Sequence, residues 1–160
     1  MKEKDSADQK FMKKALLEAR NAFLRDDYPV GAVLVINNKI VGKSSNTLQT
    51  KQTWGHHAET QLLLANSEKI RAAKVKNKNT QIELYSTLEP CLMCFGCASL
   101  HRVDRIVYSC PDPMGGATSV SRKNLPNFYH RHWPGVVSGI LKEESYSMLH
   151  EWMSKRDTEI

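Results

Sequence analysis

The feature that most constrains the fold is a near-continuous apolar run, PVGAVLVI, at residues 29–36. Its length suits a β-strand, and the lack of polar alternation is typical of a strand that is covered on both faces. A turn at Asn37, Asn38 and Lys39 follows, and IVGKSSN at 40–46 predicts a hairpin partner for the first strand. The run therefore predicts a strand inside a sheet that is covered on both faces.

Helical and strand patterns alternate along the rest of the chain. FMKKALLEARNAF has apolar residues at helical spacing, and HAETQLLLANSEK is also typical of a helix. A hairpin followed by alternating helices and strands predicts one α/β domain over residues 1–160, with helices on both faces of a central sheet. The expected helices are 11–23, 57–69, 91–101 and 143–153, the expected strands are 82–87, 105–109 and 135–140, and 111–116 is expected to be a loop.

The composition excludes some classes of protein. No apolar run approaches eighteen residues, so a membrane-spanning helix is not expected. The charged start, MKEKDSADQK, lacks the apolar core of a secretory signal, which favours a cytoplasmic protein. Three of the four cysteines, Cys91, Cys94 and Cys97, are spaced three residues apart, and in a reducing compartment such clustering indicates metal binding rather than disulfides.

Two short motifs stand at expected helix starts. WGHHAETQLLLA places His57 two residues before Glu59, and TLEPCLMC places Cys91 and Cys94 directly after a strand. His-x-Glu alone would arise by chance about 0.4 times in such a chain, whereas Pro-Cys-x-x-Cys would arise about 0.003 times. In sheets of this class, ligands gather beyond strand ends where helices begin. The two motifs are therefore expected to form one site.

The residue types and spacing predict a zinc ion. Cys91 and Cys94 are one helical turn apart and share a face, and the positive end of the helix favours thiolates, the form that binds zinc. Pro90 suits the first helical turn because it has no N–H to leave unpaired there. A catalytic zinc needs three protein ligands and an open position for water, and His57 is the natural third ligand.

Glu59 is the more informative residue of its motif. Residues two apart on a regular helix point about 200° apart, so His57 is expected at the helix cap if both side chains reach one site. Glu59 then need not bind the metal and can move protons between water and a substrate. The combination of His-x-Glu with Pro-Cys-x-x-Cys is the pattern of the zinc nucleobase deaminases.

A non-catalytic, zinc-stabilised binding module is the alternative. Such a structural site needs a fourth protein ligand, which Cys97, His56 or His101 could provide. This alternative leaves Glu59 and Pro90 without a role, and the catalytic interpretation is favoured for that reason.

Four features carry a resemblance to a known family, namely PVGAVLV, Asn46, HAE and TLEPCLMC. Through them, residues 10–120 resemble the cytidine/deoxycytidylate deaminase superfamily. The resemblance is strongest to its bacterial tRNA adenosine deaminase branch. The resemblance implies a three-layer α/β/α sandwich around a five-stranded mixed sheet. It also implies a homodimer that converts adenosine to inosine in a tRNA anticodon loop.

The same resemblance assigns roles to individual residues. It implies that His57, Cys91 and Cys94 hold Zn²⁺, that Glu59 shuttles protons, and that Asn46 hydrogen-bonds the substrate. Val30 and Leu88 would form an apolar wall. The backbone of Ala58 or Cys94 is a further candidate for orienting water or the substrate.

Parts of the chain depart from the tRNA branch and leave the substrate open. The segments FGCASLH and CPDPMGGATSV differ from the usual pattern, and related branches act on cytosine, guanine or deoxycytidylate. The aromatic segment 128–133 could stack on bases or pack on the sheet, and packing is favoured. The net charge of +6 favours a polyanionic partner, and the basic stretch 67–79 is either a phosphate-contacting patch or a solvated helix end.

Overall fold

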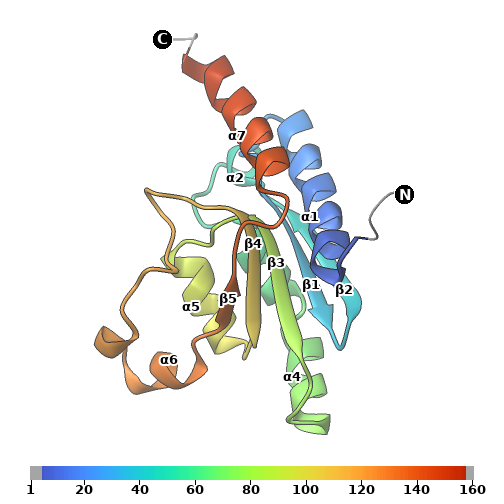
Figure 1. Ribbon diagram of the computed structural model, residues 1–160, viewed down its shortest axis with the longest axis vertical. Coiled ribbons are helices and arrows are strands. Elements are labelled where there is room, and N and C mark those ends of the chain that lie inside the picture. The colour runs from blue at the N-terminus through green and yellow to red at the C-terminus, as the bar shows by residue number, and fades with distance from the viewer. Residues whose placement is uncertain (1–4, 158–160) are drawn as a thin grey trace.

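The computed structural model describes residues 5–157 and contains a five-stranded sheet in the order β2-β1-β3-β4-β5 (Figure 1). β1 pairs antiparallel with β2 and with β3, whereas β3, β4 and β5 are parallel, so the sheet is mixed as expected. The strands are β1 (Gly31–Ile36), β2 (Lys39–Ser45), β3 (Ile82–Leu88), β4 (Arg105–Cys110) and β5 (Gly135–Val137).

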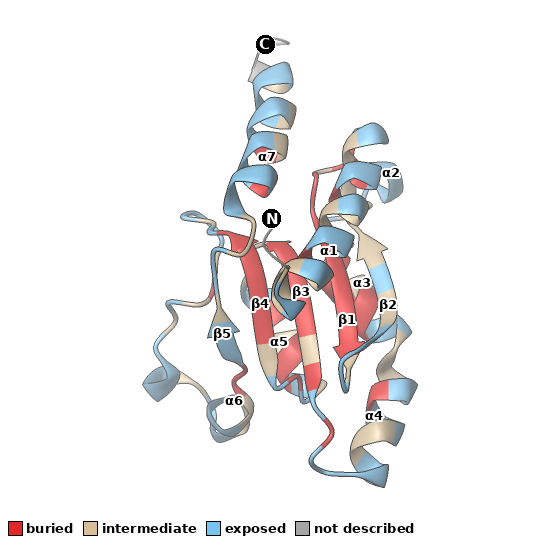
Figure 2. Cartoon of the chain, turned by 45° about the vertical axis from the view of Figure 1, so that its right-hand side comes forward, coloured by how far each residue is buried: buried red, intermediate tan, exposed pale blue. Residues whose placement is uncertain are grey.

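Helices cover both faces of the sheet, which confirms the expected three-layer sandwich. α1 and α7 lie on one face, and α3 and α5 pack against each other on the other face (Figures 1 and 2). In residues 5–157 no helix is both long enough and apolar enough to cross a membrane. The helices are α1 (Ala7–Leu24), α2 (Leu48–Lys51), α3 (Ala58–Ala65), α4 (Ser67–Lys76), α5 (Leu92–Leu100), α6 (Asn127–His132) and α7 (Lys142–Asp157), with a 3₁₀ turn, η1, at Arg122–Asn124.

The central strand β1 is buried on both faces, as its apolar run predicted (Figure 2). Ala32 and Leu34 join the core formed with α3 and α5, whereas Val33 and Val35 join the core beneath α1. Because side chains alternate along a strand, one apolar run supplies both cores.

Gly31 allows α1 to lie very close to the start of β1. A Cβ atom at this position would collide with the backbone of Ala15 and Ala19 in α1. The Gly31 N–H also donates to Thr87 Oγ1 at 3.0 Å, which ties β1 to the neighbouring strand. This packing fixes the position of the adjacent Val30, an expected site residue.

The expected single helix over 57–69 is wrong, because the chain bends at Asn66 into a second helix. The Asn66 side chain donates to the Leu62 carbonyl at 2.8 Å, and this local hydrogen bond competes with continuation of the helix. The last strand is also shorter than the expected 135–140, because it ends at Val137 and Gly139 takes a left-handed conformation with φ +84°. The short helices α2 and α6 were not expected from the sequence.

The aromatic segment 128–133 packs on the protein at its buried end. Trp133 stacks on Phe95 of α5 with ring centroids 4.3 Å apart and is 8% exposed. Phe128 lies under the Arg102 guanidinium, 4.4 Å from its ring centroid. The preference for packing is therefore confirmed for Trp133.

Candidate metal centre

Two helix starts position the residues of the two motifs. His57 is the N-cap of α3 and keeps an extended backbone with φ −71° and ψ 148°, as the spacing to Glu59 required. Cys91 is the N-cap of α5 with a similar extended backbone, φ −71° and ψ 173°. Pro90 therefore lies outside the helix, and its expected place in the first turn is wrong because Cys91 occupies the cap. The Pro90 carbonyl instead accepts a hydrogen bond from Ala117 N at 3.0 Å.

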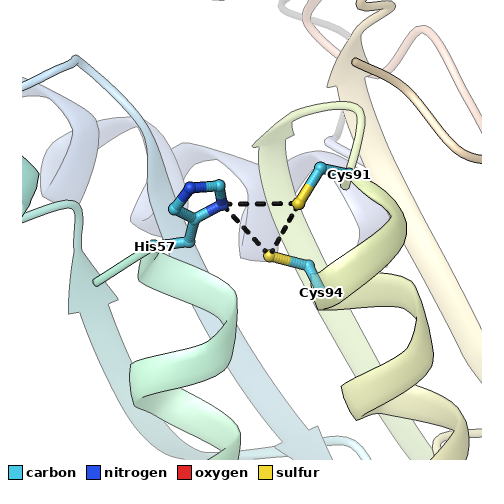
Figure 3. Close-up of side chains that lie close together, drawn as sticks. All are labelled: His57, Cys91 and Cys94. Carbon is cyan, nitrogen blue, oxygen red and sulfur yellow. Dashed lines mark hydrogen bonds between the residues drawn. The ribbon is translucent and has the colours of Figure 1, made fainter. Parts of the chain in front are cut away.

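The side chains of His57, Cys91 and Cys94 converge on one point (Figure 3). His57 Nδ1 lies 3.5 Å from Cys91 Sγ and 3.4 Å from Cys94 Sγ, and the two sulfurs are 3.7 Å apart. These three atoms form a nearly equilateral triangle between the starts of α3 and α5.

The triangle has the size that zinc requires. With Zn–S bonds of about 2.3 Å, Zn–N bonds of about 2.05 Å and tetrahedral angles, the S···S edge would be about 3.8 Å and each N···S edge about 3.6 Å. The observed edges agree with these values to about 0.2 Å. One imidazole nitrogen and two sulfurs are also a donor set that zinc prefers. The residues therefore fit the ion on both geometry and chemistry.

Electrostatics at the two sulfurs also favour a cation. The contact with Cys94, followed by the one with His57, lowers the pKa of Cys91 to about 4. The same Cys91–Cys94 contact, together with burial, raises the pKa of Cys94. A metal ion that binds both sulfurs would displace any proton that they carry.

Glu59 lies beside the triangle without belonging to it. The residue is 3% exposed, and its carboxylate accepts a hydrogen bond from Ser86 Oγ at 2.8 Å and comes within 3.6 Å of Cys94 Sγ. Burial is the main cause that raises the pKa of Glu59 above its usual range. A buried carboxyl that exchanges protons closer to neutral pH is suited to acid–base chemistry.

No fourth protein ligand completes the triangle among residues 5–157. Cys97 Sγ lies 3.6 Å from His101 Nδ1, and His101 Nε2 faces Ser67 Oγ at 2.5 Å. His56 Nδ1 faces Thr47 Oγ1 at 3.4 Å. All three alternative ligands thus have partners elsewhere, and a zinc ion held by the triangle would keep one coordination position for water.

A cavity of about 220 Å³ opens over the triangle. Asn46, Val30 and Leu88 meet there, as expected, although they come from different segments of the chain. Ala58 does not line the cavity, since its side chain is fully buried in the core behind it. The lining residues are Tyr28, Val30, Asn46, Leu48, His57, Glu59, Leu88, Glu89, Cys91 and Asp112.

Sequence reasoning missed four of these residues, namely Tyr28, Leu48, Glu89 and Asp112. Only Glu89 carried a signal, because it stands within the TLEPC motif. Its carboxylate accepts hydrogen bonds from Asp112 N at 3.0 Å and Thr118 N at 3.1 Å, and from the Thr118 hydroxyl. Glu89 therefore anchors the loop that brings Asp112 to the cavity.

A His–Cys–Cys metal triangle with an open position, beside a buried carboxylate on an α/β/α sandwich, defines a zinc-dependent hydrolase. Residues 5–110 match the family described as the cytidine and deoxycytidylate deaminase zinc-binding region. The chain belongs to this family.

Named relatives extend the similarity over most of the chain. The tRNA-specific adenosine deaminase of Bacillus subtilis is 36% identical over 142 residues, which cover 89% of this chain and 86% of that protein. The protein of the same name from Agrobacterium fabrum is 33% identical over 146 residues, covering 91% and 93%.

Solved structures agree with the fold. One from a study of A-to-I editing by tRNA:A34 deaminases at the wobble position of transfer RNA is 35% identical, with a TM-score of 0.69 over 88% of this chain and 99% of that one. Guanine deaminase from Nitrosomonas europaea has a TM-score of 0.73 over 91% of this chain and 84% of its own, at 18% identity, and supports the fold alone.

Proposed function

We propose that this protein deaminates adenosine to inosine in the anticodon loop of tRNA. The observation that carries the proposal is the 36% identity to a tRNA-specific adenosine deaminase across 89% of this chain. The solved relative at 35% identity, which concerns the wobble position of transfer RNA, points to the same substrate. The metal triangle and the adjacent carboxylate supply the chemistry that this reaction needs.

We propose that Glu59 moves the protons of the reaction. When bound to His57, Cys91 and Cys94, zinc would act as a Lewis acid that lowers the pKa of water toward about 7. Glu59 takes a proton from the attacking water and delivers protons to the ring nitrogen and to the departing amine. A C–O bond forms and the C–N bond to the exocyclic amine breaks, so that water and adenosine yield inosine and ammonia. Ser86 holds the Glu59 carboxylate in place through the 2.8 Å hydrogen bond.

Asn46 is proposed to hydrogen-bond the substrate. Its side chain is buried, and its Oδ1 accepts a hydrogen bond from Leu48 N at 2.9 Å, which leaves the Nδ2 donors for a ligand in the cavity. Val30 and Leu88 provide apolar surface against which a base can lie. The role of the Ala58 backbone stays a prediction.

The substrate proposal predicts inosine in tRNA. Incubation of the zinc-loaded protein with tRNA that carries adenosine at the wobble position should convert that base, as read by nuclease digestion and chromatography. Affinity for the RNA should fall with salt, with log K decreasing by roughly 0.7 per phosphate contact on a single strand. Salt-insensitive turnover of guanine, cytosine or deoxycytidylate, with no inosine in RNA, would contradict the proposal.

We infer that the protein forms a homodimer through the outer surface of α3 and α5. Both helices lie on one face of the sheet, and they carry exposed apolar side chains. Such a patch is typical of a protein interface. Its exposed members are Leu64, at 65% exposure, and Leu92 and Met93, at 59% and 43%.

Substituting both Leu64→Lys and Met93→Lys should convert the dimer to a monomer, because a charge at each position would be buried in the interface. Light scattering coupled to size exclusion measures the mass. Leu17→Lys is a matched control, since Leu17 is 58% exposed on α1, on the opposite face of the sheet. A wild-type mass of one chain, or an unchanged dimer in the double variant, would refute this interface.

We also infer that residues 1–160 form one deaminase domain that works in the cytoplasm. Both core clusters share the strands of a single sheet, which supports one folding unit. A tRNA substrate requires a compartment that contains tRNA, and this supports the cytoplasmic location.

A further inference from the structure

A second hollow surface lies away from the metal centre. Two cavities of about 640 and 460 Å³ share Lys74, Lys78 and Arg102 in their walls and therefore form one groove. The groove runs from α4 past the end of α5 to α6. We call it the basic groove and define it by its cationic residues, Arg71, Lys74, Lys78, Arg102 and Arg131.

The basic groove lies at the opposite end of the sheet from the metal centre. Lys74 Nζ donates to Thr80 O at 2.7 Å and pairs with Asp104 at 2.8 Å, just before β3 and β4 begin. The metal ligand Cys91 instead follows the other end of β3. The six residue steps of β3 at about 3.3 Å each separate the two ends by about 20 Å. In Figure 1, α4 and α6 both lie toward the lower end of the sheet.

Positive charge in the groove is largely uncompensated. Asp104 is the only carboxylate among its lining residues, and Lys74 already pairs with it. Within residues 5–157, Arg71, Lys78 and Arg131 form no ion pair. Such a concentration of cations in a concave surface raises the local positive potential and attracts polyanions.

The pKa of the nearby His132 is consistent with this field. Burial, followed by the charges of Arg102 and Arg131, lowers the pKa of His132. The groove also has an apolar floor, where Val75 is 78% exposed and Leu100 is 56% exposed. A positively charged groove can follow the backbone of a nucleic acid.

We propose that the basic groove binds the phosphate backbone of the tRNA substrate, at a point about 20 Å from the reacting base. The inference rests on the proposed function and deepens it, because a free base or mononucleotide could not reach both places at once. The proposal also changes the role of the basic stretch 67–79. That stretch lies too far from the metal centre to hold the phosphates beside the reacting nucleotide.

The test compares two double variants of the full-length protein that change the net charge equally. One is Arg71→Glu with Lys78→Glu in the groove. The other is Lys10→Glu with Lys14→Glu, two exposed positions on α1 at the opposite face of the sheet. Fluorescence anisotropy measures the affinity for labelled full-length tRNA and for a short oligonucleotide that covers only the anticodon loop, at several salt concentrations.

The groove variant should bind full-length tRNA about tenfold more weakly, with a salt slope that is shallower by about two units, because two phosphate contacts are lost. Its affinity for the loop oligonucleotide should equal that of the control variant. The control should lose far less affinity for full-length tRNA.

Equal losses in both variants would overturn the proposal, since net charge alone would then explain them. A groove variant that binds tRNA normally but changes its mass in light scattering would also overturn it, and would assign the groove to a protein interface. If the wild type forms no inosine but the groove variant still loses tRNA affinity selectively, the proposed function fails while the RNA-binding groove stands.

Discussion

Substituting Glu59→Gln should lower the turnover of the zinc-loaded protein by about 10²–10⁴-fold, the usual contribution of a general acid–base, while zinc stays bound. The amide keeps the shape of the carboxyl group and can still accept the hydrogen bond from Ser86. It cannot take a proton from water or return one to the substrate. Ammonia release measures turnover, and elemental analysis measures the metal content.

A second, half-buried carboxylate provides the matched control. Glu83 lies on the same strand as Ser86 but near its far end, where it pairs with Arg105. Glu83→Gln should cost some stability and leave turnover per folded molecule unchanged. The role given to Glu59 is wrong if the Glu59→Gln variant loses its metal and then turns over normally once zinc is restored. Glu59 would then only have held the metal ligands in position.

The metal triangle was predictable from sequence because its geometry is local. Cys91 and Cys94 are placed by one helical turn, and the spacing of His57 and Glu59 required a helix cap, which the structure confirms. Only the meeting of the two helix starts depended on the tertiary fold. The buried run of β1 indicated a sheet covered on both faces, and that is sufficient to bring helix starts together beyond strand ends.

Tyr28, Leu48 and Asp112 of the cavity were not predictable, because they lie in segments that meet only in the folded chain. Tyr28 precedes β1, Leu48 lies in the unexpected short helix α2, and Asp112 is brought in by the loop that Glu89 anchors. None of these residues belongs to a segment with the hydrophobic periodicity of a helix or a strand. The break at Asn66 depends on one side-chain hydrogen bond, which hydrophobic spacing does not reveal.

The basic stretch 67–79 shows that a charge pattern in the sequence also does not reveal where the charges lie in the fold. Its composition indicated a site for phosphates, but position in the sequence does not give distance from the metal centre. In the fold, Lys74 is held by Asp104, and the stretch joins Arg102 and Arg131 from two later segments. The charge is therefore shared by a surface that no single segment of the sequence displays.

Substituting Cys91→Ala should remove most of the bound zinc and lower the melting temperature by about 10 °C. At a zinc concentration about 1,000-fold above its dissociation constant, binding to the native state adds about 4 kcal/mol to the free energy of unfolding. For a domain of this size, each kcal/mol corresponds to about 2–4 °C. Loss of one ligand of three also abolishes turnover, because the Lewis acid is no longer held beside Glu59. Elemental analysis and thermal denaturation, with and without a chelator, measure both effects.

Cys97→Ala is the control for this prediction and separates a catalytic from a structural zinc. Cys97 lies one helical turn beyond Cys94, but its sulfur faces His101 and not the metal triangle. Its removal should leave one zinc per chain, the same response to chelator and undiminished turnover. If Cys97→Ala instead loses zinc as Cys91→Ala does, the site is closed by a fourth protein ligand. An ion with four protein ligands has no position for water, and the hydrolytic mechanism would then fail with it.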